Sequence, residues 1–245
     1  MSSSPRVALI TGCARRIGAS IARHLHAHGW NLVLHAHHSA SELQALAEQL
    51  QQQRSNSVLT LLGDLRDPAL PAQLVERSVA HFGRLDGLIN NASNFHPTPL
   101  ASATPEQWQD LFGVNAQAPF FLAQAAAPIL REHAGAIVNL SDLHASRPLR
   151  DHPLYCAAKA ALEMLTRSLA LELAPQVRVN AIAPGAILWP DQGKSEAAKQ
   201  ALLARTPLAR TGDPEEIAAA VRWLLEEASF LTGHILPLDG GRRLS

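Results

Sequence analysis

The sequence is poor in aromatic residues and cysteine, and it has no excess of charge of either sign. Phe, Trp and Tyr make up 4% of the 245 residues, and Tyr155 is the single tyrosine. Two cysteines, Cys13 and Cys156, are too few for a disulfide framework or a four-ligand zinc site, which favours a reducing compartment such as the cytoplasm. The 21 basic and 21 acidic residues balance, and no basic stripe is visible, so no nucleic-acid partner is expected.

Long apolar runs are also lacking at the start of the chain. The first apolar run, Val7 to Ile10, is too short for a signal-peptide core or a membrane span, so neither export nor membrane contact is expected. The composition is 47% apolar, enough for a substantial core, and α/β folds of this length routinely form one domain. We therefore expect a single domain over residues 1–245.

Short apolar runs alternate with longer segments of helical period, a rhythm typical of repeated βαβ units around a doubly wound, mainly parallel sheet. Seven strands are predicted: Val7 to Thr11, Asn31 to His35, Val58 to Leu62, Gly87 to Asn90, Ala136 to Leu140, Arg178 to Ile182 and His234 to Pro237. Six helices are predicted between them, on both faces: Ile17 to Gly29, Ala40 to Gln53, Pro68 to Phe82, Val114 to Glu132, Pro153 to Ala174 and Pro214 to Glu226. Ligands of such sheets bind beyond the carboxyl ends of the strands.

The first predicted strand runs into the turn Thr11-Gly12-Cys13-Ala14-Arg15-Arg16-Ile17-Gly18, after which a helix begins. A glycine at such a turn lets backbone amides approach a diphosphate, and the helix N-terminus adds partial positive charge. Arg16 adds a planar cation that can contact a phosphate or a flat heterocycle. The alternative is an arginine that lies on the helix surface.

The second predicted strand ends in histidines and a serine where an NAD site usually has an acid. The stretch is His35-Ala36-His37-His38-Ser39. A carboxylate would repel the 2′-phosphate of NADPH, whereas these side chains and Arg16 can donate hydrogen bonds to it, so NADPH is favoured over NADH. The alternative, a metal cluster of the three histidines, lacks acidic or cysteine partners nearby, and no metal is expected.

Tyr155 and Lys159 lie four residues apart on a predicted helix, which stacks the phenol and the ammonium on one face. An isolated tyrosine ionises near pH 10, so a neighbouring cation is expected to make this phenol a better proton donor near neutrality.

Together these motifs resemble the short-chain dehydrogenase/reductase family, a Rossmann-type fold, over Val7 to Gly241. Its usual Thr-Gly-x-x-x-Gly-x-Gly turn is matched except that Arg16 replaces the middle glycine, and Tyr155 with Lys159 matches its catalytic pair. The resemblance implies that cofactor-lining roles fall to Gly12, Ile17, Gly18, Asp64, Leu65, Asn91, Ala92, Ser93, Pro184 and Gly185. It also implies a catalytic Asn115 that helps to hold a water chain from the lysine, a mobile substrate loop over about 186–212 that begins at Ile187 to Pro190, the C-terminal motif Asp239-Gly240-Gly241, and a homotetramer.

Four features resemble the pteridine reductases within this family: Arg16, the histidine and serine stretch, the loop Ser93 to Phe95, and Asp142, which stands 13 positions before the tyrosine in place of the usual serine. His38 departs from them, because they have an arginine there. The resemblance implies that Phe95 and the nicotinamide sandwich a pterin, that Ser93 and Arg16 donate to it, and that Asp142 and Tyr155 deliver protons.

Alternatives to this prediction remain at three points. Ser141 could do the work of the usual serine while Asp142 caps a helix or lies in a loop. Phe95 could simply fold onto the protein. The substrate could be a ketone or an acyl-carrier thioester, reduced by the same machinery without the pterin sandwich.

Overall fold

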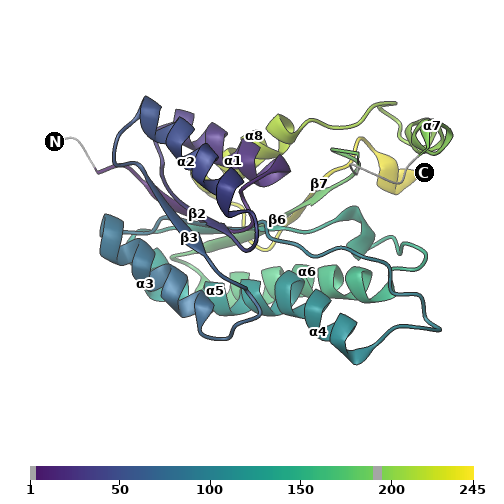
Figure 1. The fold of residues 1–245 in the computed structure, drawn as a ribbon, viewed down its shortest axis with the longest axis horizontal. Helices are drawn as coiled ribbons and strands as arrows, with labels where there is room; N and C mark the ends of the chain where they lie inside the picture. The colour runs from purple at the N-terminus through teal and green to yellow at the C-terminus, as the bar shows by residue number, and fades with distance from the viewer. Residues whose placement is uncertain (1–3, 190–194) are drawn as a thin grey trace.

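The short runs of Val, Leu and Ile form strands, and the inner strands are buried on both faces, as a parallel sheet covered by helices requires. A computed structural model describes residues 4–189 and 195–245 (Figure 1). Within these residues seven strands form one sheet in the order β3-β2-β1-β4-β5-β6-β7, with every neighbouring pair parallel. They are β1 (Val7–Ile10), β2 (Asn31–Ala36), β3 (Val58–Leu62), β4 (Gly87–Asn90), β5 (Ala136–Leu140), β6 (Arg178–Pro184) and β7 (Ile235–Leu238). The predicted doubly wound fold is confirmed.

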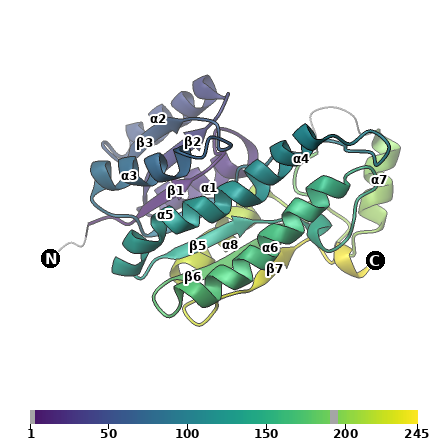
Figure 2. The ribbon, with the colours of Figure 1, turned by 90° about the horizontal axis from the view of Figure 1, so that it is seen from below.

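Helices cover both faces of the sheet. Three of them pack on one face: α1 (Arg16–Ala27), α2 (Ala40–Gln53) and α8 (Pro214–Glu226). Three others pack on the opposite face: α3 (Leu70–Phe82), α5 (Ala118–Glu132) and α6 (Pro153–Leu173). Figure 2, seen from below, shows α5 and α6 running side by side under the strands. No helix of the described residues is long and apolar enough to cross a bilayer.

The strand order reverses at β1, which lies between β2 and β4. Successive crossovers therefore lead away from this point to opposite faces, and a crevice opens beyond the carboxyl ends of β1 and β4. This topology alone brings the glycine turn after β1 next to Asn91 and Ala92 after β4.

The helix predicted over Val114 to Glu132 begins differently in the structure. Residues Gly113–Gln117 form a π-helical turn, and α5 starts only at Ala118. Asn115 causes part of this widening, because its Nδ2 donates to the Leu111 carbonyl, 2.9 Å away, and so competes with the backbone bonds of a regular α-helix. The other predicted boundaries fall within two residues of those observed, although Pro184 belongs to β6 rather than to the turn after it.

Two helices were not predicted, α4 (Pro105–Phe112) and α7 (Glu196–Ala204). The signal for α4 was present in the sequence as a capping box, in which the Thr104 hydroxyl accepts from the Gln107 amide and the Gln107 side chain accepts in return. The signal for α7 was its N-cap, Ser195. α7 lies inside the predicted substrate loop, and residues 190–194 of that loop, Pro190 among them, lie outside the described residues.

We expect Gly12→Ala to destabilise the protein more than Gly83→Ala does. Both glycines have left-handed backbones, with φ of 62° and 73°, which costs a non-glycine residue about 1–2 kcal/mol. A Cβ on Gly12 would also lie 2.7 Å from the Ala92 Cα, whereas one on Gly83 would meet nothing within 4 Å. Overpacking adds about 1–3 kcal/mol at Gly12 alone. Urea unfolding of both variants measures the difference, and equal losses would contradict the close approach of β1 and β4.

Candidate functional site

A groove of about 580 Å³ runs along the carboxyl ends of β1 to β4. It brings together every cofactor residue predicted from this half of the chain: Gly12, Arg16, Ile17, Gly18, His35, His37, His38, Ser39, Asp64, Leu65, Asn91, Ala92 and Ser93. The remaining four, Tyr155, Lys159, Pro184 and Gly185, line an adjoining pocket of about 200 Å³. The roles assigned to these residues stay predictions, but their placement in one continuous depression follows from the topology.

The floor of the groove is a direct junction between the ends of β1 and β4. The Asn91 side-chain amide donates to the carbonyls of Thr11 and Gly12, each at 2.9 Å, and the Thr11 hydroxyl accepts from the backbone N–H of Asn91 and Ala92. Arg15, the N-cap residue of α1, makes no side-chain capping bond. The first-turn amides of α1 therefore face the groove without a side-chain acceptor, which suits an anionic group.

Arg16 stands at the boundary between the groove and the catalytic pockets, and it lines all three. Its φ of 54° is left-handed, which explains why a glycine usually occupies this position, and an arginine there costs about 1–2 kcal/mol. Its guanidinium donates to the Trp189 carbonyl at 3.3 Å and lies 3.5 Å from that of Leu188. Residues with strained backbones cluster at functional sites, so the strain at Arg16 supports a role for its side chain in the groove.

The histidines after β2 divide into two environments. His35 is buried, its Nε2 lies 3.1 Å from the Gly63 carbonyl, and burial lowers its pKa to about 4. It is therefore neutral near pH 7, so it could serve a 2′-phosphate only as a neutral hydrogen-bond donor. His37 and His38 are exposed and lie with Ser39 at the groove, and their rings are in tilted contact, with centroids 3.5 Å apart and planes at 32°. No cluster of metal-ligating side chains is found among the described residues.

Asp64 is held by Arg66 rather than standing free. The Arg66 guanidinium donates to both Asp64 carboxylate oxygens, at 2.6 to 3.0 Å, and its backbone N–H donates as well. The hydrogen bonds from Arg66 lower the pKa of Asp64 to about 2. The carboxylate is therefore a fixed anion at the end of the groove, with lone pairs left to accept from a base amino group.

The centre of the catalytic pocket is the pair formed by Tyr155 on α6 and Asp142 after β5. The Tyr155 hydroxyl donates to Asp142 Oδ2 at 2.7 Å, and the other carboxylate oxygen accepts from the His144 backbone N–H at 2.7 Å. Ser141 points elsewhere, because its hydroxyl donates to Glu163 at 3.0 Å. Asp142 thus caps the short turn that follows it and also accepts a hydrogen bond from the phenol, while its role in proton delivery stays a prediction.

Burial, followed by the neighbouring Asp142 carboxylate, raises the pKa of Tyr155 above its ordinary value. The phenol of the free protein is therefore less acidic than an exposed tyrosine, contrary to the expectation that Lys159 makes it more acidic. Lys159 Nζ lies 5.9 Å from the centre of the Tyr155 ring and donates to the Leu140 carbonyl at 2.8 Å. Burial lowers the pKa of Lys159 to about 8, against the opposing attraction of Asp142.

Phe95 lies at the wall of a further pocket of about 310 Å³ that it shares with Arg16, Asp142 and Tyr155. Its ring stacks on His152 at 4.7 Å and meets Tyr155 edge-on at 4.7 Å, yet 56% of the residue is exposed. The ring is thus fixed on one side while much of its apolar surface still faces solvent. A flat ligand could cover that surface.

Asn115 contacts the Phe95 loop rather than the lysine. Its amide donates to the Asn94 carbonyl at 2.9 Å and its oxygen accepts from the Ser93 hydroxyl at 2.7 Å. The structure therefore brings Asn115 and Ser93 together, and no hydrogen bond joins Asn115 to Lys159 in the part of the chain described here.

Several site residues were not predicted. Arg15, Arg66, Asn94 and Asp110 line the groove, and His152 packs on Phe95. Asp110 lies on α4, and the capping box at the start of that helix was the sequence signal for the element that carries it.

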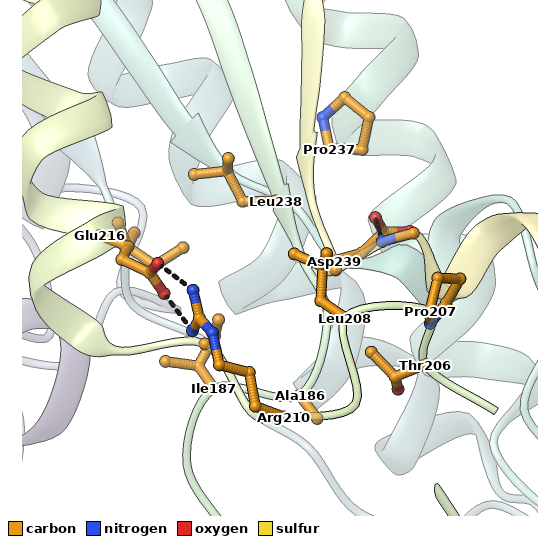
Figure 3. Close-up of a pocket in the computed structure, with 14 residues that line it drawn as sticks. Ala186, Ile187, Thr206, Pro207, Leu208, Arg210, Glu216, Pro237, Leu238 and Asp239 are labelled. Carbon is orange, nitrogen blue, oxygen red and sulfur yellow. Dashed lines mark hydrogen bonds and ion pairs between the residues drawn. The ribbon is translucent and has the colours of Figure 1, made fainter. Parts of the chain in front are cut away.

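A separate cavity of about 400 Å³ lies beside the end of β7 (Figure 3). Its walls are mainly aliphatic, from Ile187, Leu208 and Leu238, and the ion pair between Arg210 and Glu216 (2.7 Å) crosses one side. It contains none of the predicted catalytic residues. Both ends of the predicted substrate loop contribute to it, so it lies under that loop rather than in the nucleotide groove.

Comparisons with known proteins agree on one family. A family model described as enoyl-(acyl carrier protein) reductase matches residues 12–243. Pteridine reductase 1 of Leishmania tarentolae is 38% identical, with 100% of this chain and 99% of that protein covered. A putative ketoacyl reductase of granaticin polyketide synthesis from Streptomyces violaceoruber is 36% identical (97% and 96% covered), and a 3-oxoacyl-(acyl-carrier-protein) reductase of Staphylococcus aureus is 33% identical (96% of each).

Because Tyr155 is the single tyrosine, absorbance titration of the phenol reports on this one group. We expect the phenol of the folded protein to ionise at a higher pH than that of the unfolded chain, which titrates near pH 10. Asp142→Asn removes the nearby negative charge and should move the midpoint to lower pH. Identical titrations of the two folded proteins near pH 10 would contradict the pairing of Tyr155 with Asp142.

Proposed function

The chain belongs to the short-chain dehydrogenase/reductase family, and from that premise we propose that it is an NADPH-dependent pteridine reductase. Membership implies an oxidoreductase with a nicotinamide cofactor. The proposal adds the identity of the cofactor, the substrate class and the residues that act on the substrate.

The groove fits a dinucleotide with a 2′-phosphate. The junction of Gly12 with Ala92 and the uncapped first turn of α1 suit a diphosphate. No carboxylate stands at the end of β2, where His37, His38, Ser39 and Arg16 instead offer donors to a phosphate. These observations support NADPH over NADH.

The observation that carries the substrate assignment is the juxtaposition of Phe95 with Asp142 and Tyr155 in one pocket. A half-exposed aromatic ring offers a stacking surface for a planar heterocycle, and the carboxylate and phenol beside it offer hydrogen bonds to ring nitrogens. The similarity to the Leishmania pteridine reductase, over the full length of both proteins, supports the same assignment.

When bound, NADPH supplies the hydride that forms the new C–H bond, and it is oxidised to NADP⁺. Tyr155 gives its proton to the adjacent ring nitrogen as the C=N double bond of the dihydropterin becomes a single bond. Lys159 faces the same phenol and stabilises the negative charge left on its oxygen. Asp142, hydrogen-bonded to the phenol, orients it and returns a proton from solvent. Holding the reactants in this geometry can lower the barrier by about 7–11 kcal/mol.

The second candidate is a reductase of 3-oxoacyl thioesters, which the names of the Streptomyces and Staphylococcus relatives favour. Such a reductase needs a donor for a carbonyl oxygen where the usual serine stands. Here Asp142 occupies that position and Ser141 is bound to Glu163, which argues against it.

Steady-state oxidation of NADPH with dihydrobiopterin and with a 3-oxoacyl thioester separates the two candidates. We expect turnover with the pterin, a lower KM for NADPH than for NADH, and little turnover with the thioester. Turnover with the thioester alone would overturn the proposal.

We expect Arg16→Gly to weaken ligand binding without unfolding the protein. The change removes left-handed strain of about 1–2 kcal/mol and adds about 0.5–1 kcal/mol of glycine entropy, so the free energy of unfolding should stay the same or rise by up to about 1.5 kcal/mol. Loss of a charged donor worth about 1.5–3 kcal/mol should raise the KM for NADPH and for the pterin tenfold or more. Arg77→Ala, on the exposed face of α3, is the control, and unchanged KM values for Arg16→Gly would remove this residue from the site.

We further propose a homotetramer in the cytoplasm. Trp108, Phe121, Met164 and Leu171 expose large apolar surfaces on α4, α5 and α6, which supports association through these helices. Light scattering should give about four times the chain mass of 26.3 kDa, and a monomer at micromolar concentration would contradict it.

A further inference from the structure

The loop that carries Phe95 has no regular secondary structure, so side-chain contacts must fix its path. Both chain neighbours of Phe95 bind the same carboxylate. Asn94 Nδ2 donates to Asp110 Oδ1 at 2.9 Å, and His96 Nε2 lies 3.0 Å from Asp110 Oδ2. Asp110 belongs to α4, a different element, so this carboxylate ties the loop to a helix.

The spacing of these contacts determines where Phe95 points. In an extended segment successive side chains point to opposite sides, so residues 94 and 96 share one side and residue 95 takes the other. Binding Asn94 and His96 to α4 therefore directs Phe95 away from that helix, against Tyr155 and His152, where its ring is found.

Asp110 is also bound by a residue outside the loop. Its Oδ1 accepts from Arg66 at 3.0 Å, and the same guanidinium forms an ion pair with Asp64 in the nucleotide groove. The Asp110 carboxylate is therefore bound by three side chains, those of Arg66, His96 and Asn94. A charge-assisted network of this kind is more rigid than single surface contacts.

Apart from the ring contacts of Phe95 itself, the other hydrogen bonds that join the loop to the rest of the described chain lie at its two ends. Asn115 binds the carbonyl of Asn94, and the Thr98 N–H donates to the Asp151 carbonyl at 2.6 Å. Between these points, the Asp110 carboxylate is the group that binds side chains on both sides of Phe95.

We propose that Asp110 is a positioning residue that sets the direction of Phe95 and thereby the affinity of the pocket for a planar substrate. The inference rests on the proposed function for its kinetic consequence, although the contacts themselves do not depend on it. Asp110 lines the nucleotide groove and not the pocket that holds Phe95, Asp142 and Tyr155, so its effect on a pterin should appear in substrate binding rather than in the chemical step.

The kinetic test is Asp110→Asn. We expect the pterin KM to rise about tenfold, the effect of losing roughly 1.4 kcal/mol, and more than the NADPH KM, with kcat changed less than about twofold. A purely structural defect would lower the folded fraction and hence the apparent kcat, but not raise the pterin KM. In a Phe95→Ala background Asp110→Asn should have no further effect, because the positioned ring is already gone.

Asp67→Asn is the matched control, since this nearby carboxylate caps the backbone of Ala69 and has no contact with the loop. If Asp110→Asn does not fold, Asn94→Ala and His96→Ala each remove one of the two loop contacts and should each raise the pterin KM severalfold. An unchanged pterin KM in the variants, or an equal effect of Asp110→Asn with and without Phe95, would overturn the inference.

Hydrogen exchange separates failure of the inference from failure of the proposed function. In the free protein Asp110→Asn should speed amide exchange in residues 94–98 and leave β4 unchanged. If the wild-type protein reduces no pterin, the proposed function fails, yet this measurement still decides the role of Asp110. Unchanged exchange in the loop would overturn it.

Discussion

The hydrogen bond of 2.7 Å between the Tyr155 phenol and the Asp142 carboxylate organises the catalytic pocket. It joins the end of β5 to α6, and together with burial, the larger cause, the Asp142 carboxylate raises the pKa of the phenol. It also places a negative charge near the buried ammonium of Lys159, which would otherwise bear a larger desolvation cost. Three ionisable groups are thus arranged so that one of them, a neutral phenol, is available as a proton donor beside two opposite charges.

Around this pair, the sheet determines where the nucleotide groove lies, and the loops carry the residues proposed to select the substrate. The reversal of strand order at β1 fixes the nucleotide groove, because the ends of β1 and β4 must meet at Gly12 and Ala92. Arg16 joins that groove to the catalytic pocket at the cost of a left-handed backbone. Phe95 adds an apolar wall whose direction follows from the contacts of its neighbours with Asp110. The residues proposed for binding and for catalysis therefore line three adjoining depressions that have Arg16 in common.

The sequence predicted the sheet, the order of its elements and which residues line the groove. The periodic spacing of apolar residues and the glycine turns are local signals that can be recognised along the chain. It did not predict α4 as a helix, and Asp110 was therefore missed, since the value of that carboxylate arises from contacts across the fold. Burial likewise changed the chemistry of His35 and Tyr155, because desolvation depends on tertiary packing that no motif encodes. The choice between Ser141 and Asp142 needed the direction of each side chain, which became visible only when Ser141 was found on Glu163.

A crystal structure of the protein with NADP⁺ and dihydrobiopterin tests the central claim most directly. The account predicts the pterin ring lying flat between Phe95 and the nicotinamide, with a ring nitrogen within hydrogen-bond distance of the Tyr155 hydroxyl. A pterin bound elsewhere, or a pocket in which Phe95 has turned away and the phenol faces no ring nitrogen, would contradict it.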